Sequence, residues 1–232
     1  APPVQEAPAP IGTIDRPADE GAASEEVGVL ARPAAAEAPS QPAPVQRDLG
    51  RQKKLVDQLL TNCMARLSEE VSALLGGTLQ VVPTEHSALT KAGFGGKQIM
   101  ARMDIRGQGQ GEEAFLFVDV KTAVYLGGSL IMLPEGELEA TVRNEDFGDD
   151  ANDAYGEVTN IIAGVYTAVF EEQHRTKLGF VKTAMEPVTP VKVEPESDAV
   201  IPNQPYYLSA GEIEYNGKAQ GRLQLLLPAR VL

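Results

Sequence analysis

The chain has 232 residues, a net charge of −13 at pH 7, one cysteine and two histidines. An acidic balance this strong argues against a nucleic-acid binder, which needs basic surface to neutralise phosphates. A single cysteine excludes an internal disulfide framework and a zinc site built from several cysteines. No run approaches the ~18 apolar residues that a membrane span needs, and no secretory signal pattern is visible, so we expect no membrane insertion and a cytoplasmic location.

The chain begins with a segment of low complexity. Residues 1–47 interleave prolines with alanines and acids and show no apolar periodicity. Such a segment has too little apolar surface to offset the entropy of ordering, so we expect a disordered tail that serves as a linker or tether. Residues 48–232 are then expected to form one folded domain of ordinary size.

The first regular element is a helix over 51–75. Leucines, Cys63, Met64 and Val71 recur at helical spacing, and Gly76-Gly77 ends the pattern. Cys63 lies on the apolar stripe, with no histidine nearby in sequence, so we interpret it as a core residue and not as a nucleophile. A short strand over 78–82, ended by Pro83, and a loop from His86 to Gly96 are expected next.

The remaining elements come in runs, with no internal repeat evident. Two alternating segments, 98–106 and 113–120, predict an antiparallel hairpin. Helices are expected over 121–133 and 137–143. After the long helix described below, a strand is expected over 178–185, followed by a proline-rich loop that includes Pro187.

The last two strands, 206–215 and 219–227, flank Asn216-Gly217, the strongest hairpin signal in the chain. Because strands follow one another without alternating with helices, we predict an α+β fold in two layers. Its sheet should be mostly antiparallel, with about six strands and with long helices packed on one face.

The most informative element is a long helix that ends near His174. Asp153, Glu157, Asn160 and Gly164 fall within a narrow arc of one face at about 100° per residue. Five apolar residues gather on the opposite side: Val158, Ile161, Ile162, Val165 and Val169. The pattern predicts a helix with a core face and an exposed polar face. An ordinary solvated face would show the same spacing, so spacing alone does not establish a site.

Acidic residues are concentrated just before and within the start of this helix. Asp149, Asp150 and Asp153 lack the ligand spacing of an EF-hand calcium loop. Carboxylates at a helix N-terminus can cap free N–H groups and interact favourably with the helix dipole. We therefore favour capping over a metal site and expect no metal or cofactor of the protein's own.

The phrase Asp153-x-x-x-Glu157-x-x-Asn160, followed by Ile-Ile-Ala-Gly164, resembles the active-site helix of the chemotaxis phosphatases, the CheC, CheX and FliY family. In general layout, the resemblance covers about the last 180 residues, but its specific part is this helix. It implies a CheC/CheX-like fold and a phosphatase that dephosphorylates a CheY-like response regulator. The alternative is a non-catalytic domain of the same fold that docks to a receiver or to flagellar or sensory machinery.

The resemblance also implies roles for single residues. Asn160 would hold the attacking water and Glu157 would bind the active-site lysine of the receiver, which also carries the Mg²⁺. Asp153 and Gly164 would lie in the partner-binding surface. The presence of a single motif resembles the CheX type, whose members pair as homodimers: the first helix offers Glu70 but has Ala73 where asparagine is needed. The family tends to carry a proline after the motif, and Pro187 lies slightly too far along the chain.

Overall fold

The computed structural model describes residues 44–89, 97–189 and 200–232. The predicted tail therefore lies outside the described residues up to residue 43, and its last four residues, 44–47, already belong to the first helix. Part of the expected loop before residue 97 and most of the proline-rich loop after Pro187 also lie outside them.

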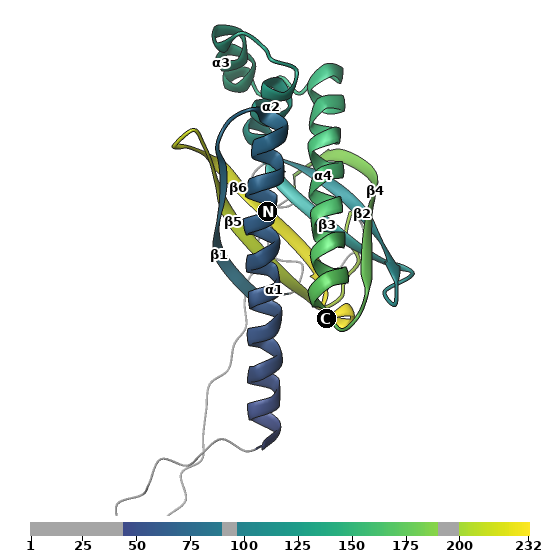
Figure 1. Cartoon of the computed structure of the whole chain (residues 1–232). Coiled ribbons are helices and arrows are strands. Elements are labelled where there is room, and N and C mark those ends of the chain that lie inside the picture. The colour runs from purple at the N-terminus through teal and green to yellow at the C-terminus, as the bar shows by residue number, and fades with distance from the viewer. Residues whose placement is uncertain (1–43, 90–96, 190–199) are drawn as a thin grey trace, which may run out of the picture. The chain divides into compact units, whose positions relative to one another are not determined.

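Two long helices, α1 (Pro44–Leu75) and α4 (Asp149–Gln173), run side by side across one face of the sheet (Figure 1). An ion pair of 3.0 Å between Arg66 and Glu172 joins them on the solvent side. Two shorter helices, α2 (Val120–Leu130) and α3 (Glu135–Asn144), lie between them in the sequence and sit toward one end of the layer. In the described part of the chain, no helix is long and apolar enough to span a bilayer.

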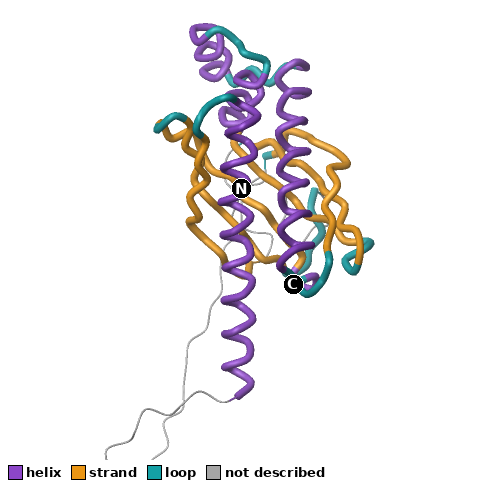
Figure 2. Tube along the Cα trace, in the orientation of Figure 1, coloured by secondary structure: helices purple, strands orange, loops and turns teal. Residues whose placement is uncertain are grey.

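The second layer is one six-stranded sheet in which every pair is antiparallel (Figure 2). The strands are β1 (Leu79–Leu89), β2 (Gln98–Gly107), β3 (Glu112–Asp119), β4 (Leu178–Val188), β5 (Tyr206–Tyr215) and β6 (Lys218–Pro228). Their order across the sheet is β1-β5-β6-β3-β2-β4. The predicted α+β fold class is confirmed, with both hairpins and the Asn216-Gly217 turn, whose two residues adopt positive φ angles of 50° and 75°.

Two prolines were placed wrongly from the sequence. Pro83 does not end its strand: β1 continues to Leu89, past a shift of register between Pro83 and Glu85. Pro187 does not open a loop, because it pairs with Ile99 inside β4. Both strands are edges of the sheet, where a proline without an N–H removes no ladder bond that a neighbour needs.

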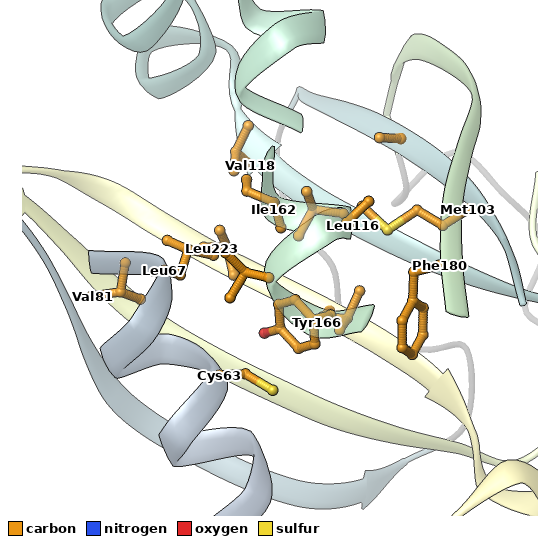
Figure 3. Packing of buried hydrophobic residues seen from close by; sticks show 14 of the residues in the cluster. Cys63, Leu67, Val81, Met103, Leu116, Val118, Ile162, Tyr166, Phe180 and Leu223 are labelled. Carbon is orange, nitrogen blue, oxygen red and sulfur yellow. The ribbon is translucent and has the colours of Figure 1, made fainter. Parts of the chain in front are cut away.

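The main core lies between the helices and the sheet (Figure 3). Cys63 and Leu67 of α1 and Ile162 and Tyr166 of α4 lie in one layer with strand residues such as Leu223. Cys63 is fully buried, as predicted. A smaller cluster covers the opposite face of the sheet, around Phe115 and Tyr206, which explains why β3 is buried on both faces.

The sheet order exposes an internal two-fold relation that the sequence does not show. The first half consists of α1, β1, β2 and β3, and the second half consists of α4, β4, β5 and β6. If each strand is replaced by its counterpart in the other half (β1 by β4, β2 by β5, β3 by β6), the strand order read from one edge of the sheet becomes the order read from the other edge. Thus the β1–β5 pair corresponds to the β4–β2 pair, and the β3–β6 pair lies at the centre. Helices α2 and α3 are inserted between the halves.

The correspondence extends to single side chains. Ser68 on α1 accepts a hydrogen bond from the backbone N–H of Val81, and Thr167 on α4 accepts one from Phe180, both at 2.8 Å. The irregularity in β1 at Thr84 likewise has its equivalent in β4 at Thr183. The two residue numbers in each of these pairs (Ser68 and Thr167, Val81 and Phe180, Thr84 and Thr183) differ by the same amount. Adding this difference to a residue number in the first half therefore gives the equivalent residue in the second half.

Candidate functional site

Helix α4 has the two faces that the sequence predicts. Asp153, Glu157, Asn160 and Gly164 are all exposed along one stripe. On the opposite side the apolar residues are buried, with one correction: Ile161 is only partly buried, whereas Ile162 is 1% exposed. A helix turns about 100° per residue, so Ile161, next to Asn160, lies at the boundary between the faces. It lines a small hollow against α1 together with Gly164.

The two polar side chains of the motif are neighbours that hardly restrain each other. The Asn160 amide lies 3.5 Å from the Glu157 carboxylate, at the outer limit for a hydrogen bond. Both groups stand on a helix whose other face is packed into the core, so their backbone is rigid while their polar atoms stay available to a partner.

The acids at the start of α4 lie in the first turn, where the dipole argument places them, but the prediction that they cap the helix with their side chains is wrong. Gly148 occupies the N-cap position without a side-chain hydrogen bond, and Asp149 and Asp150 lie in the first turn. The carboxylate that does cap a helix is Asp119, which accepts a hydrogen bond of 2.9 Å from the backbone N–H of Thr122 in α2. Among the described residues, no three His, Cys, Asp or Glu side chains are arranged so that they could hold one metal ion.

An open groove of about 840 Å³ lies beside the exposed stripe. Its α4 wall carries Asp150, Asp153 and Glu157, and its opposite wall is formed by β4 around Lys182 and Thr183. The end of α2 closes one side with Leu130 and Ile131, of which Ile131 is partly exposed. The groove therefore brings together two elements that are separated in sequence and places Glu157 at its edge.

Lys182 is the groove residue that the sequence analysis missed. Its ammonium donates a hydrogen bond of 2.9 Å to the carbonyl oxygen of Gly156, directly before Glu157. A signal was present, because Leu178, Phe180 and Lys182 alternate along β4 and the first two point into the core. A lysine at the next inward position is unusual and indicates a special environment.

The equivalent place in the first half is occupied by a polar network. By the numbering shift, Asp57 stands where Gly156 does, Gln58 where Glu157 does, and Thr61 where Asn160 does. Asp57 pairs with Lys53 at 2.7 Å and accepts a short hydrogen bond from Tyr207, so its carboxylate is held in a network although the side chain is 28% exposed. The second half alone combines an exposed Glu–x–x–Asn pair with a groove.

Ionisation in this network follows its contacts. Burial opposes ionisation of Asp57, but the hydrogen bonds from Lys53 and Tyr207 together hold the pKa of its carboxyl below the ordinary value. Burial lowers the pKa of His86, whose Nε2 lies 3.3 Å from the Thr61 hydroxyl. In the core, burial strongly raises the pKa of the Cys63 thiol, which argues against a nucleophilic thiolate.

Comparison with known proteins was made at three levels. No protein-family model matches the sequence, and no curated protein matches it. Solved structures do match. FliY of Thermotoga maritima superposes with a TM-score of 0.65 at 16% identity, over 78% of this chain and 91% of that chain.

Two further solved structures match this chain with lower TM-scores. FliM in the FliG–FliM complex from H. pylori matches with a TM-score of 0.59 at 14% identity, over 79% of this chain and 93% of that chain. A chemotaxis protein CheX from Desulfovibrio desulfuricans matches with a TM-score of 0.42 at 16% identity, over 73% of this chain and 97% of that chain. The FliY and FliM matches confirm, at the level of the fold, the resemblance to the CheC, CheX and FliY family. The CheX subtype stays a prediction.

Proposed function

We propose that the protein is a phosphatase that hydrolyses the aspartyl-phosphate of a CheY-like response regulator. The observation that supports this most is the position of Glu157 and Asn160, which are both exposed on helix α4, with Glu157 lining the groove. The fold shared with FliY is consistent with a place in chemotaxis signalling. We propose further that the protein works as a cytoplasmic homodimer, as the single-motif resemblance implies.

A sparse site is sufficient for this reaction because the substrate is already reactive. The receiver brings its own Mg²⁺ and lysine, so this chain needs no metal of its own. Water adds to phosphorus in line, the bond to the aspartyl oxygen breaks, and the products are the free carboxylate and inorganic phosphate. The Asn160 amide would orient the water and the Glu157 carboxylate would bind the lysine of the receiver.

The required energy is modest. An acceleration of ~100-fold corresponds to about 2.7 kcal/mol of transition-state stabilisation. One or two well-placed hydrogen bonds supply that much when their groups are held in position. Asp153 and Gly164, on the same exposed stripe, would contact the partner's surface without taking part in the chemistry.

A second candidate function is a non-catalytic docking domain. The FliM structure from H. pylori was solved in a complex with FliG, so a protein of this fold does bind another protein. In that case the exposed face of α4 would serve recognition alone.

One assay separates the two candidates. Phosphate release should be measured from a panel of phosphorylated receiver domains, with the protein, without it, and with the double variant Glu157→Ala/Asn160→Ala. A phosphatase accelerates release from at least one receiver, and the double variant does not. A docking domain binds a receiver or another partner but leaves the rate of phosphate release unchanged.

A further inference from the structure

Lys182 is a cation placed in an acidic groove without an acidic partner. The groove carries three carboxylates, Asp150, Asp153 and Glu157, and among the described residues that line it Lys182 is the only charged base. No ion pair of the Lys182 ammonium within 4.0 Å is found among the residues that the structure describes. Within the described parts of the chain its one hydrogen bond is to the Gly156 carbonyl oxygen, and an ammonium has three N–H donors. Two donors are thus left for a ligand.

The position of this ammonium depends on a glycine. A Cβ atom at residue 156 would lie 2.9 Å from the Lys182 Nζ and 3.8 Å from the Met185 Cε. Any other residue would therefore push the ammonium away from its carbonyl. Gly156 is buried inside α4, where alanine has the higher helix propensity, so the glycine has a local cost that the Lys182 contact offsets.

The combination of Gly156 and Lys182 occurs only in the second half of the molecule, which carries the Glu–x–x–Asn motif. In the first half, Pro83 stands where Lys182 does and Asp57 where Gly156 does. There the polar groups satisfy one another, because Asp57 is bound by Lys53 and Tyr207. The free cation and the exposed Glu–x–x–Asn pair are therefore found together in one half and absent together from the other.

We propose, resting on the function proposed above, that Lys182 binds the phosphoryl group of the substrate. The carboxylate of Glu157 would attract a cation of the partner, and the ammonium of Lys182, which lines the same groove, would attract the anion. Both groups lie beside the same turn of α4, since Gly156 directly precedes Glu157. On a protein of net charge −13, such a cation also offsets the repulsion between the acidic groove and a phosphorylated partner.

The test compares three lysine variants in the phosphate-release assay, with a receiver that the parent protein dephosphorylates. Lys182→Ala should lower kcat/KM at least tenfold, with most of the loss in KM and with a smaller loss at high salt. Lys182→Arg should recover most of the activity because it keeps the charge. The matched control is Lys218→Ala, which removes an exposed lysine from the β5–β6 turn and should leave kcat/KM unchanged.

A glycine pair gives an independent test. Gly156→Ala moves the ammonium without removing it, so it should lower kcat/KM less than Lys182→Ala does, and it should have no further effect in the Lys182→Ala variant, where no ammonium is left to move. Gly50→Ala is the control, since a Cβ at this helical position of α1 meets nothing within 4 Å. Circular dichroism should show that all variants keep the parent's helix content and melt within about 3 °C of it.

The outcomes are distinct. If Lys182→Ala, folded, retains the parent's kcat/KM while Glu157→Ala/Asn160→Ala is inactive, Lys182 has no role and the proposed function stands. If Lys182→Arg is as impaired as Lys182→Ala, the charge is not what matters and the inference is wrong. If the parent accelerates release from no receiver, the proposed function fails and the role of Lys182 fails with it.

Discussion

At the scale of single residues, Glu157 and Asn160 have different proposed roles, so replacing each by alanine should change different kinetic quantities. Asn160→Ala removes a group needed mainly in the transition state, so we expect turnover to fall about 10- to 100-fold with receiver binding unchanged. Glu157→Ala removes a charge that contacts the partner, so binding and turnover should both weaken, more at low salt. Kinetics and calorimetric binding at two salt concentrations measure both effects.

Neither change should unfold the protein. Both side chains are exposed, and replacements at such positions usually change the free energy of unfolding by about 0.5 kcal/mol or less. Variants that melt far below the parent would show that these residues support the fold instead. Variants that bind and hydrolyse like the parent would refute the assignment of roles.

His86 should make stability depend on pH. Its pKa is lowered below the ordinary value of 6.5 by burial, Lys53 lowers it further, and Asp57 partly opposes the shift. The unfolded chain therefore gains a proton near pH 6.5 while the folded chain does not. The stability that His86 contributes is present above that pH and is lost as the pH falls through the folded-state pKa.

Denaturant unfolding at pH 7.5 and pH 5.5 checks this prediction. The parent should lose stability between the two conditions, and His86→Gln should lose less. Asp57, whose pKa is lowered from 3.8, acts in a more acidic range and does not confuse the comparison. Equal losses in parent and variant would show that other groups cause the dependence.

At the scale of elements, α4 shows both the strength and the limit of sequence periodicity. Its period predicts the exposed stripe of Asp153, Glu157, Asn160 and Gly164 correctly, because each position on a regular helix is fixed by its neighbours. The same reasoning predicts that Ile161 is in the core, and this prediction is wrong because Ile161 is only partly buried at the boundary between the two faces. Whether a boundary residue is covered depends on the neighbouring helix α1, which the local pattern does not contain.

Adjacent isoleucines therefore make a sharp test of the two faces. Ile162→Ala should lower the free energy of unfolding by about 2–5 kcal/mol, because a fully buried side chain leaves a cavity. Ile161→Ala should cost about 1 kcal/mol or less, since part of its side chain already contacts water. Guanidinium titration of both variants measures the difference, and equal losses would contradict the assignment of faces.

Thr167 connects the edge strand β4 to helix α4 through hydrogen bonds. Its hydroxyl donates to the Ala163 carbonyl oxygen at 2.9 Å and accepts from the Phe180 N–H at 2.8 Å. Thr167→Val keeps the shape but leaves that strand N–H without an acceptor, which should cost about 1–3 kcal/mol. Amide hydrogen exchange should show faster exchange at Phe180 than in the parent. Unchanged protection there would mean that the hydroxyl is dispensable.

At the scale of the whole molecule, the internal two-fold relation is the feature that the sequence hides. The element order and the two local hairpins are predictable because they depend on neighbouring residues. The sheet order is not, since it joins β1 to β5 and β4 to β2 across long distances in sequence. The repeat itself is hidden because matched positions carry different side chains, such as Asp57 and Gly156.

The candidate site was predictable to the same extent. Its exposed pair lies on one helix, so spacing alone reveals the geometry of Glu157 and Asn160. The groove needs β4 packed beside α4, and Lys182 enters it only through that tertiary contact. From the sequence, the place of a second motif is expected at Glu70 and Ala73, whereas the structure aligns Gln58 and Thr61 with the site.

The two-fold relation predicts what a transplanted motif will do. Gln58→Glu/Thr61→Asn installs the Glu–x–x–Asn pair at the equivalent positions of α1. We expect kcat/KM of the parent to change less than twofold. We also expect the same graft to restore nothing in the Glu157→Ala/Asn160→Ala variant.

The reason is that a polar network occupies the place beside the graft where α4 has Gly156 and Lys182. Thr61 is half-buried and bonded to the Asp57 carbonyl oxygen at 2.9 Å, so an asparagine there would not stand free as Asn160 does. Asp57, held by Lys53 and Tyr207, fills the place that Gly156 leaves open beside Lys182. Activity at α1 should require opening this network first, for example with Asp57→Gly. Full rescue by the simple graft would show that the exposed pair suffices without a groove, and that the geometry around Gly156 and Lys182 contributes nothing to the reaction.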